Sequence, residues 1–138
     1  NELKQKYTME LVHTYCKPRF YHEYALSRLK SEGYMLGCAS NSIKESIEVM
    51  LLKSNLIKYM DVIYSAQDVL KPKPDPDIYI KAISTLGMTP EECLVIEDNE
   101  NGIKAAKDSG AHVMVVKEVS EVNFINIKQK IDQINKKL

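Results

Sequence analysis

The sequence has no surplus of either charge, no long apolar run and few cysteines. Lys and Arg number 19 and Asp and Glu number 19, so the formal net charge is zero. Proteins that bind nucleic acid usually carry a basic surface with aromatic side chains on which bases stack, and the sequence contains no stretch of that kind. No apolar run approaches the roughly 18 residues that are needed to span a bilayer. We therefore expect neither a nucleic-acid partner nor a membrane partner.

The cysteines indicate a reducing compartment. There are three of them, and two, Cys38 and Cys93, lie within apolar runs that are typical of strands. Their spacing, with Cys16 included, matches no metal site. The N-terminus is charged and lacks the apolar core of a signal peptide. These features predict reduced thiols and a cytoplasmic location.

The hydrophobic pattern predicts an α/β fold. Short apolar runs predict buried strands over residues 34–39, 62–64, 93–96 and 112–116. Helical spacing of apolar residues predicts helices over residues 1–15, about 20–30, 43 onward, about 76–87, 101–110 and from about 122 onward. Strands that alternate with helices indicate a parallel sheet that helices cover on both faces. Ligands of such sheets bind beyond the carboxyl ends of the strands.

Three polar groups follow these strands, and each has two interpretations. Glu97 and Asp98 are hard oxygen ligands suited to partly hydrated Mg²⁺, or else a solvated loop that caps the next helix. Lys73 lies between prolines and can neutralise a phosphoryl group, or it is a surface lysine in a turn. Ser40 can bind a phosphate oxygen through its hydroxyl, or it caps a helix.

Taken in order along the chain, these groups resemble the haloacid dehalogenase (HAD) superfamily and, within it, the β-phosphoglucomutase-like phosphatases. The matching segments are Ala39-Ser40-Asn41-Ser42, Lys73-Pro74-Asp75-Pro76-Asp77-Ile78-Tyr79 and Val95-Ile96-Glu97-Asp98-Asn99-Glu100-Asn101-Gly102-Ile103. The resemblance extends from about Phe20 to Val116. It implies a three-layer, HAD-like Rossmannoid α/β fold with a parallel sheet and helices on both faces.

The resemblance also implies a function and a set of site residues. It implies a Mg²⁺-dependent phosphatase or phosphomutase that acts on a small phosphorylated metabolite, such as a sugar phosphate. Asp98 would bind the metal with help from Glu97. Lys73 and Ser40 would be the catalytic residues, and together with the backbone N–H of Asn41 they would hold the phosphoryl group.

A second lysine and an Asp-x-Asp segment compete with these assignments. Lys71 also precedes a proline, but only counting from Lys73 places the proline, the aspartate and the aromatic residue of the family pattern correctly. Asp75-Pro76-Asp77 spells the Asp-x-Asp of the family's nucleophile motif. It follows a proline-rich loop rather than a strand and lacks the glycine that follows that motif, so we do not assign it as the nucleophile.

The aspartate that the resemblance requires as nucleophile is missing, since residues 1–33 contain no aspartate. In the family it ends the first strand, attacks phosphorus and forms an aspartyl-phosphate, while a second aspartate acts as general acid and base. That strand lies between the serine strand and the acidic-pair strand. We therefore expect a fold without its first strand and most of its helical cap, in which the sheet is split or re-paired. Residues 1–18 would be a remnant of the cap or linker, and residues 19–138 an incomplete core.

Three hypotheses follow from the missing aspartate. In the first, the chain, which begins at Asn1 rather than Met, is the C-terminal part of an enzyme and does not turn over an ester alone. In the second, it is a catalytically inactive module that binds phosphate or another protein. In the third, a partner chain supplies the aspartate. The choice of substrate, and between phosphatase and mutase, depends on the cap, while His13, His22 and His112 match no motif position.

Overall fold

The computed structural model of the chain describes residues 2–5 and 19–136. Its strands and helices follow one another in alternation, with four short 3₁₀ turns between them. The strands are β1 (Glu2–Gln5), β2 (Met35–Ala39), β3 (Val62–Tyr64), β4 (Cys93–Glu97) and β5 (His112–Val115). The helices are α2 (Phe20–Ser31), α3 (Lys44–Lys53), α4 (Asp77–Thr85), α5 (Glu100–Ser109) and α6 (Phe124–Lys136). The 3₁₀ turns are η1 (Ile57–Tyr59), η2 (Ala66–Asp68), η3 (Pro90–Glu92) and η4 (Val119–Glu121).

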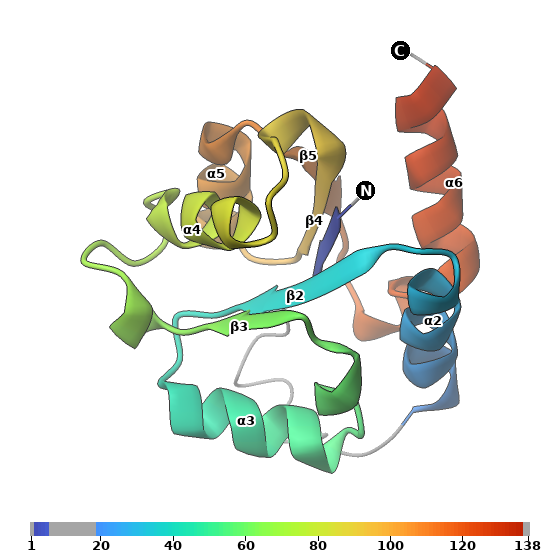
Figure 1. Cartoon of the computed structure of the whole chain (residues 1–138), viewed down its shortest axis with the longest axis horizontal. Helices are drawn as coiled ribbons and strands as arrows, with labels where there is room; N and C mark the ends of the chain where they lie inside the picture. Colours follow the sequence, from blue (N-terminus) through green and yellow to red (C-terminus); the bar gives the residue numbers. More distant parts are fainter. Residues whose placement is uncertain (1, 6–18, 137–138) are drawn as a thin grey trace.

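The strands form one parallel sheet in the order β3-β2-β1-β4-β5. β1 lies at its centre, where Leu3 is aligned with Leu36 of β2 and with Leu94 of β4. From β1 the chain builds the sheet first toward β3 and then, after α4, toward β5 (Figure 1). The order therefore reverses at the centre, and at such a reversal the carboxyl ends of the strands border a crevice.

Helices cover both faces of the sheet (Figure 1). The side chains of β4 alternate between them: Leu94 and Ile96 join the core beneath α2, α3 and α6, whereas Cys93 and Val95 join the core beneath α4 and α5. All four are buried. This two-sided burial explains why the strand is a continuous apolar run rather than an alternating one.

Residue types that commonly end or begin a helix lie at the end of α2 and at the start of η3. Gly33 follows α2 with a φ of 93°, a left-handed conformation that favours glycine, and the next amide, of Tyr34, donates to the carbonyl of Leu29 at 3.0 Å. Thr89 starts η3 with a capping box, in which its backbone N–H donates to Glu92 Oε1 at 2.9 Å.

The predicted fold class is confirmed, and the structure corrects one of its segments. The helix predicted over residues 1–15 is wrong for Glu2–Gln5, which form β1, while the remainder of that range lies outside the described residues. The sheet is re-paired rather than split, because Glu2–Gln5 occupy the position of the first strand. These residues contain no aspartate. The division of the chain at residue 18 stays a prediction, as residues 6–18 are not described.

The other predicted elements agree with the structure to within a few residues at each end. Within the described ranges, none of the helices combines the length and the apolar character that crossing a membrane would require.

Candidate active site

A buried ion pair lies at the carboxyl edge of the sheet. The ammonium of Lys73 contacts Glu97 Oε2 at 3.1 Å, and the side chains of the two residues are 1% and 0% exposed. The same ammonium donates to the carbonyl oxygen of Ala39 at 3.0 Å. The lysine therefore joins the ends of β2 and β4 across the position of β1.

Glu97 is held by groups from several directions. Its Oε2 also accepts a hydrogen bond of 2.7 Å from the hydroxyl of Tyr79. Its Oε1 accepts hydrogen bonds from the backbone N–H of Asp98 at 3.1 Å and of Asn99 at 3.4 Å. Both carboxylate oxygens are thus engaged with the chain's own donors, which offsets the cost of burying a charge.

Tyr79 completes the buried network. Its ring lies under the ammonium of Lys73, with 4.6 Å from the nitrogen to the ring centroid, a geometry that stabilises the cation. Burial raises the pKa of the Tyr79 hydroxyl well above its ordinary value of 10.0, and the negative charge of Glu97 raises it further. The hydroxyl therefore stays protonated and acts as a donor.

The loop that carries Lys73 is fixed by the side chain of Asn41. The backbone N–H of Lys73 donates to Asn41 Oδ1 at 3.0 Å, and Asn41 Nδ2 donates to the carbonyl of Lys73 at 3.2 Å. We predicted only a backbone contact between Asn41 and phosphate. The structure adds a role for the side chain, which ties the loop after β2 to the proline-rich loop and so places the lysine.

Ser40 follows β2 directly and is buried. Its backbone N–H donates to Tyr64 at the end of β3 at 3.1 Å, and its hydroxyl oxygen accepts from the N–H of Ser42 at 3.1 Å. Because its neighbour Ala39 accepts the Lys73 ammonium, Ser40 and Lys73 lie at the same corner of the sheet.

Gly102 allows α5 to approach the buried carboxylate. Asn99 caps this helix by accepting from the backbone N–H of Asn101 at 2.9 Å and of Gly102 at 3.3 Å. A Cβ at Gly102 would overlap the carboxylate of Glu97. Neither Gly102 nor Tyr79 was assigned a role from the sequence, although both lie within the segments that carry the family resemblance.

Asp98 is the residue best suited to a metal. It is half-buried and follows Glu97 at the end of β4. Among residues 2–5 and 19–136, no cluster brings together three His, Cys, Asp or Glu side chains that could hold a metal ion. A partly hydrated Mg²⁺ needs only one or two protein carboxylates when phosphate supplies further oxygens. The residues present fit such an ion with Asp98 as ligand, whereas the oxygens of Glu97 already hold Lys73, Tyr79 and the backbone.

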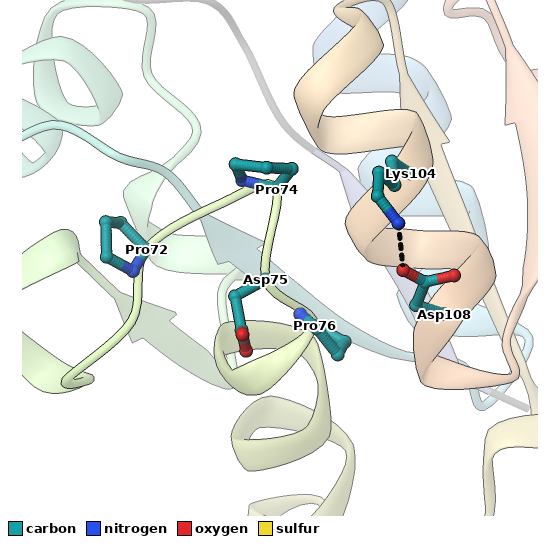
Figure 2. A pocket seen from close by; sticks show the side chains of 6 residues that line it. All are labelled: Pro72, Pro74, Asp75, Pro76, Lys104 and Asp108. Atoms are coloured by element: carbon teal, nitrogen blue, oxygen red, sulfur yellow. Dashed lines mark hydrogen bonds and ion pairs between the residues drawn. The ribbon is translucent and has the colours of Figure 1, made fainter.

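The residues rejected as alternatives lie outside this network. Lys71 is exposed, and Asp75 Oδ1 accepts from the backbone N–H of Asp77 at the start of α4, at 3.1 Å. Figure 2 shows Asp75 at the rim of a surface pocket between the proline-rich loop and α5. That pocket is lined by Pro72, Pro74, Asp75, Pro76, Lys104 and Asp108.

His22 and His112 likewise lie outside this network, and each contacts a backbone carbonyl oxygen instead. His22 Nε2 lies 3.0 Å from the carbonyl of Val119, and His112 Nε2 lies 3.0 Å from the carbonyl of Glu91. His13 lies outside the described residues.

Known proteins resemble the chain over most of its length. A family model described as haloacid dehalogenase-like hydrolase matches residues 1–116. A phosphoglycolate phosphatase of Aquifex aeolicus is 33% identical over 109 residues, which are 79% of this chain and 51% of that protein. The chain spans between 39% and 51% of the length of the first curated relatives that it matches.

Solved structures show the same fold. CbbY from Rhodobacter sphaeroides in complex with phosphate aligns with a TM-score of 0.66 at 28% identity, over 70% of this chain and 44% of that one. The β-phosphoglucomutase of Clostridium difficile aligns with a TM-score of 0.73 over 91% of this chain and 62% of that one. At 22% identity, the second match concerns the fold alone.

Proposed function

Because the chain belongs to the haloacid dehalogenase-like hydrolase family, we propose that it forms the phosphoryl-binding part of a Mg²⁺-dependent phosphatase or phosphomutase. The substrate class is a small phosphorylated metabolite. Its relatives include a phosphoglycolate phosphatase, a pyrophosphatase and a phosphatase of phosphorylated carbohydrates. The feature common to these names is the phosphoryl group, which is what the site residues are suited to bind.

The observation that supports this proposal is the buried ammonium of Lys73 at the carboxyl edge of the sheet. A cation attracts a phosphoryl oxygen more strongly in a poorly solvated site than in water. The ammonium is held at 3.0 Å from Ala39 and at 3.1 Å from Glu97, so it is already oriented.

Each residue has a separate part in phosphoryl binding. The Lys73 ammonium neutralises an oxygen of the phosphoryl group, and the Ser40 hydroxyl and the Asn41 backbone N–H donate to others. Glu97 and Tyr79 are positioning residues that act through the lysine. Asp98 would hold Mg²⁺, which, when bound, neutralises negative charge on the phosphoryl group.

Turnover requires an aspartate that residues 1–33 do not contain. Its carboxylate oxygen would form a bond to phosphorus while the ester bond breaks, and the departing oxygen would take a proton from a second acid. Water would then cleave the aspartyl-phosphate, releasing phosphate and restoring the carboxylate. We accordingly propose that the chain alone binds phosphate without turnover, and that a preceding segment or a partner chain supplies the nucleophile.

Phosphate binding to the full chain tests the proposal. With inorganic phosphate and Mg²⁺ in titration calorimetry, the unchanged chain should bind, whereas Ser40→Ala and Asp98→Asn should each weaken binding by roughly tenfold, as loss of a charge-assisted contact would. Lys71→Met is the matched control and should bind like the unchanged chain. Equal binding by the unchanged chain, Ser40→Ala and Asp98→Asn would overturn the proposal.

A catalytically inactive phosphate-binding or interaction module is the second candidate. The absence of an aspartate from residues 1–33 favours it. Turnover of phosphate esters by the protein as expressed from its native gene, lost in Asp98→Asn, would exclude this candidate.

A cytoplasmic location is part of the first proposal. It is supported by Cys38 and Cys93, which are buried thiols on different strands.

A further inference from the structure

Three of the exposed large apolar side chains lie where α2 and α6 begin. Phe20, Tyr24 and Ile125 are 81%, 40% and 68% exposed. The ring of Phe20 stacks on that of Tyr24 with 5.8 Å between the centroids, and the ring of Tyr24 meets that of Phe124 edge-on at 5.9 Å. Phe124 and Ile125 are the first two residues of α6, which lies beside α2 (Figure 1). Exposed apolar side chains that touch one another in this way are typical of a contact surface.

Arg28 is fixed on the same surface. Its guanidinium carbon lies 4.4 Å from the centroid of the Phe124 ring and 5.6 Å from that of Tyr24, and Nη1 donates to the Tyr24 hydroxyl at 2.6 Å. Glu32 accepts from Nη2 at 3.1 Å and neutralises the charge. Arg28 is one of two arginines among the 19 basic residues of the chain. Aromatic residues and Arg are enriched at protein interfaces, and a side chain that is already fixed loses little entropy when a partner binds.

The exposed face of α2 has large side chains in its first half and small ones in its second half. Phe20, Tyr24, Ser27 and Ser31 follow one another at spacings of three and four residues, and all four are exposed. Residues at these spacings share one side of a helix, and the buried residues of α2 lie on the other side. The face is therefore uneven, with two rings at one end and two small hydroxyl side chains at the other.

We propose that this face of α2 binds a second copy of the chain, with the two α2 helices antiparallel. A two-fold axis at the middle of α2 places Phe20 opposite Ser31 of the second copy and Tyr24 opposite Ser27, and each contact occurs twice. Large side chains then fill the space over small ones, so the helices can approach closely. In a parallel arrangement Phe20 would meet Phe20 and Ser31 would meet Ser31, which leaves a gap between the serines.

Charge favours the same arrangement. Glu23 and Lys30 are seven residues apart, so they lie on the same flank of the face but in opposite halves of α2. The two-fold axis brings Glu23 of one copy to within a turn of Lys30 of the other. Lys30 contacts Asp61 at 2.8 Å, and its side chain is 35% exposed, which leaves it accessible to a second carboxylate. An exposed ion pair adds little affinity, so these charges select the direction of the helices, while the aromatic contacts supply most of the binding free energy.

Sedimentation equilibrium of the full chain tests the proposal. The unchanged chain should form dimers as its concentration rises. Phe20→Glu puts a carboxylate into the contact twice and should weaken the dimer at least about tenfold. Leu52→Glu on α3 is the matched control and should dimerise like the unchanged chain, because Leu52 is 66% exposed and lies outside this face.

Two results would overturn the proposal. One is an unchanged chain that stays monomeric at every concentration, which would leave the face of α2 to a different occupant, such as a segment of another protein. The other is equal dimerisation by Phe20→Glu and Leu52→Glu, which would place the contact elsewhere on the chain.

A mixture of two variants tests the direction of the helices. Phe20→Glu and Ser31→Lys should each dimerise weakly, since each puts a charge against an uncharged side chain. An equal mixture should recover dimers, because the antiparallel arrangement brings position 20 of one chain opposite position 31 of the other, where the introduced charges attract. Both positions are exposed, so neither variant should change the thermal midpoint. A mixture that dimerises no better than its components would overturn the antiparallel arrangement.

Discussion

Two networks of charged and aromatic side chains lie in different parts of the molecule. At the carboxyl edge of the sheet, Lys73, Glu97 and Tyr79 are all buried. Between α2 and α6, Glu32 pairs with Arg28 at 3.1 Å and with Lys128 at 3.0 Å, and the side chains of Lys128 and Glu32 are 28% and 30% exposed. The pair distances in the two networks are nearly equal, and the difference between them is their exposure.

Exposure decides how much each network affects the free energy of unfolding. In the surface network, water solvates each charge, so a charge that loses its partner is still stabilised by water. In the buried network every group depends on the others, since a lone charge there has no water to replace its partner. A buried polar network adds little to stability beyond what an apolar core would provide, but it fixes one arrangement of its members. A fixed arrangement suits the proposed phosphoryl-binding site, where the Lys73 ammonium must be in position before an anion binds.

Removing Glu97 should have the largest effect. Glu97→Ala leaves the Lys73 ammonium buried without its carboxylate, and breaking such a pair typically costs about 3–5 kcal/mol. Urea denaturation should show this loss in the free energy of unfolding. Glu32→Ala is the matched control in the surface network and should change the unfolding midpoint little. A loss in Glu97→Ala no greater than in Glu32→Ala would contradict the distinction between the networks.

Gly102→Ala should have the next largest effect. The added methyl group overlaps the Glu97 carboxylate, so either α5 or the carboxylate must shift. Overpacking of this kind typically costs about 1–3 kcal/mol. The loss should be seen in denaturation, together with weaker phosphate binding, as the carboxylate positions Lys73. Unchanged stability and unchanged phosphate affinity would show that α5 does not constrain Glu97.

Tyr79→Phe should have a smaller effect. It removes one donor to Glu97 Oε2, but the Lys73 ammonium still donates to that oxygen and still lies over the ring. The loss should therefore lie at the lower end of the about 1–3 kcal/mol that a buried acceptor short of a partner costs. Tyr64→Phe is a matched control, because the Tyr64 hydroxyl makes a bond of the same length, 2.7 Å, to Thr85 at the surface. Equal losses of unfolding free energy in the two variants would be evidence against a special role for burial.

Acid should weaken the α2 side of the molecule through His22. Burial lowers the pKa of His22 from 6.5, the charge of Arg19 lowers it too, and the hydrogen bond to Val119 opposes this only in part. A group with a lowered folded pKa favours the folded state while it is neutral. The contribution of neutral His22 to the free energy of unfolding should therefore be complete above about pH 6.5. It should be lost as the pH falls toward the pKa that His22 has in the folded protein.

Unfolding free energies measured in steps from about pH 8 to about pH 5 would show this loss. His22→Gln, which keeps a donor for Val119 but does not titrate, should lose less stability over the same range. The same slope in both proteins would assign the acid sensitivity to other groups.

The site residues could be predicted from the sequence because each lies next to a local signal. Ser40 and Glu97-Asp98 end apolar runs, and Lys73 lies between prolines, so their place at the carboxyl edge followed from the strand pattern. The partners within the site could not be predicted this way. Tyr79 lies within an amphipathic helix, where an aromatic residue is ordinarily core, and only the packing of α4 on β4 shows that its hydroxyl meets Glu97.

At the start of the chain, the local pattern predicts the wrong kind of element. The pattern of residues 1–15 predicts a helix, yet Glu2–Gln5 form a strand between β2 and β4. Glu and Lys are disfavoured in strands by local propensity. The strand conformation of Glu2–Gln5 therefore depends on pairing with β2 and β4.

The alternation of strands and helices, the parallel sheet and the edge at which polar residues gather all follow from local patterns in the amino-acid sequence. These features depend on hydrophobic period and on capping residues, which act over a few neighbouring positions. Two features depend instead on contacts between distant parts of the chain: the strand Glu2–Gln5 at the centre of the sheet, and the donors that bind each carboxylate oxygen of Glu97. Backbone pairing and burial join residues far apart in the chain, and no local pattern records those contacts.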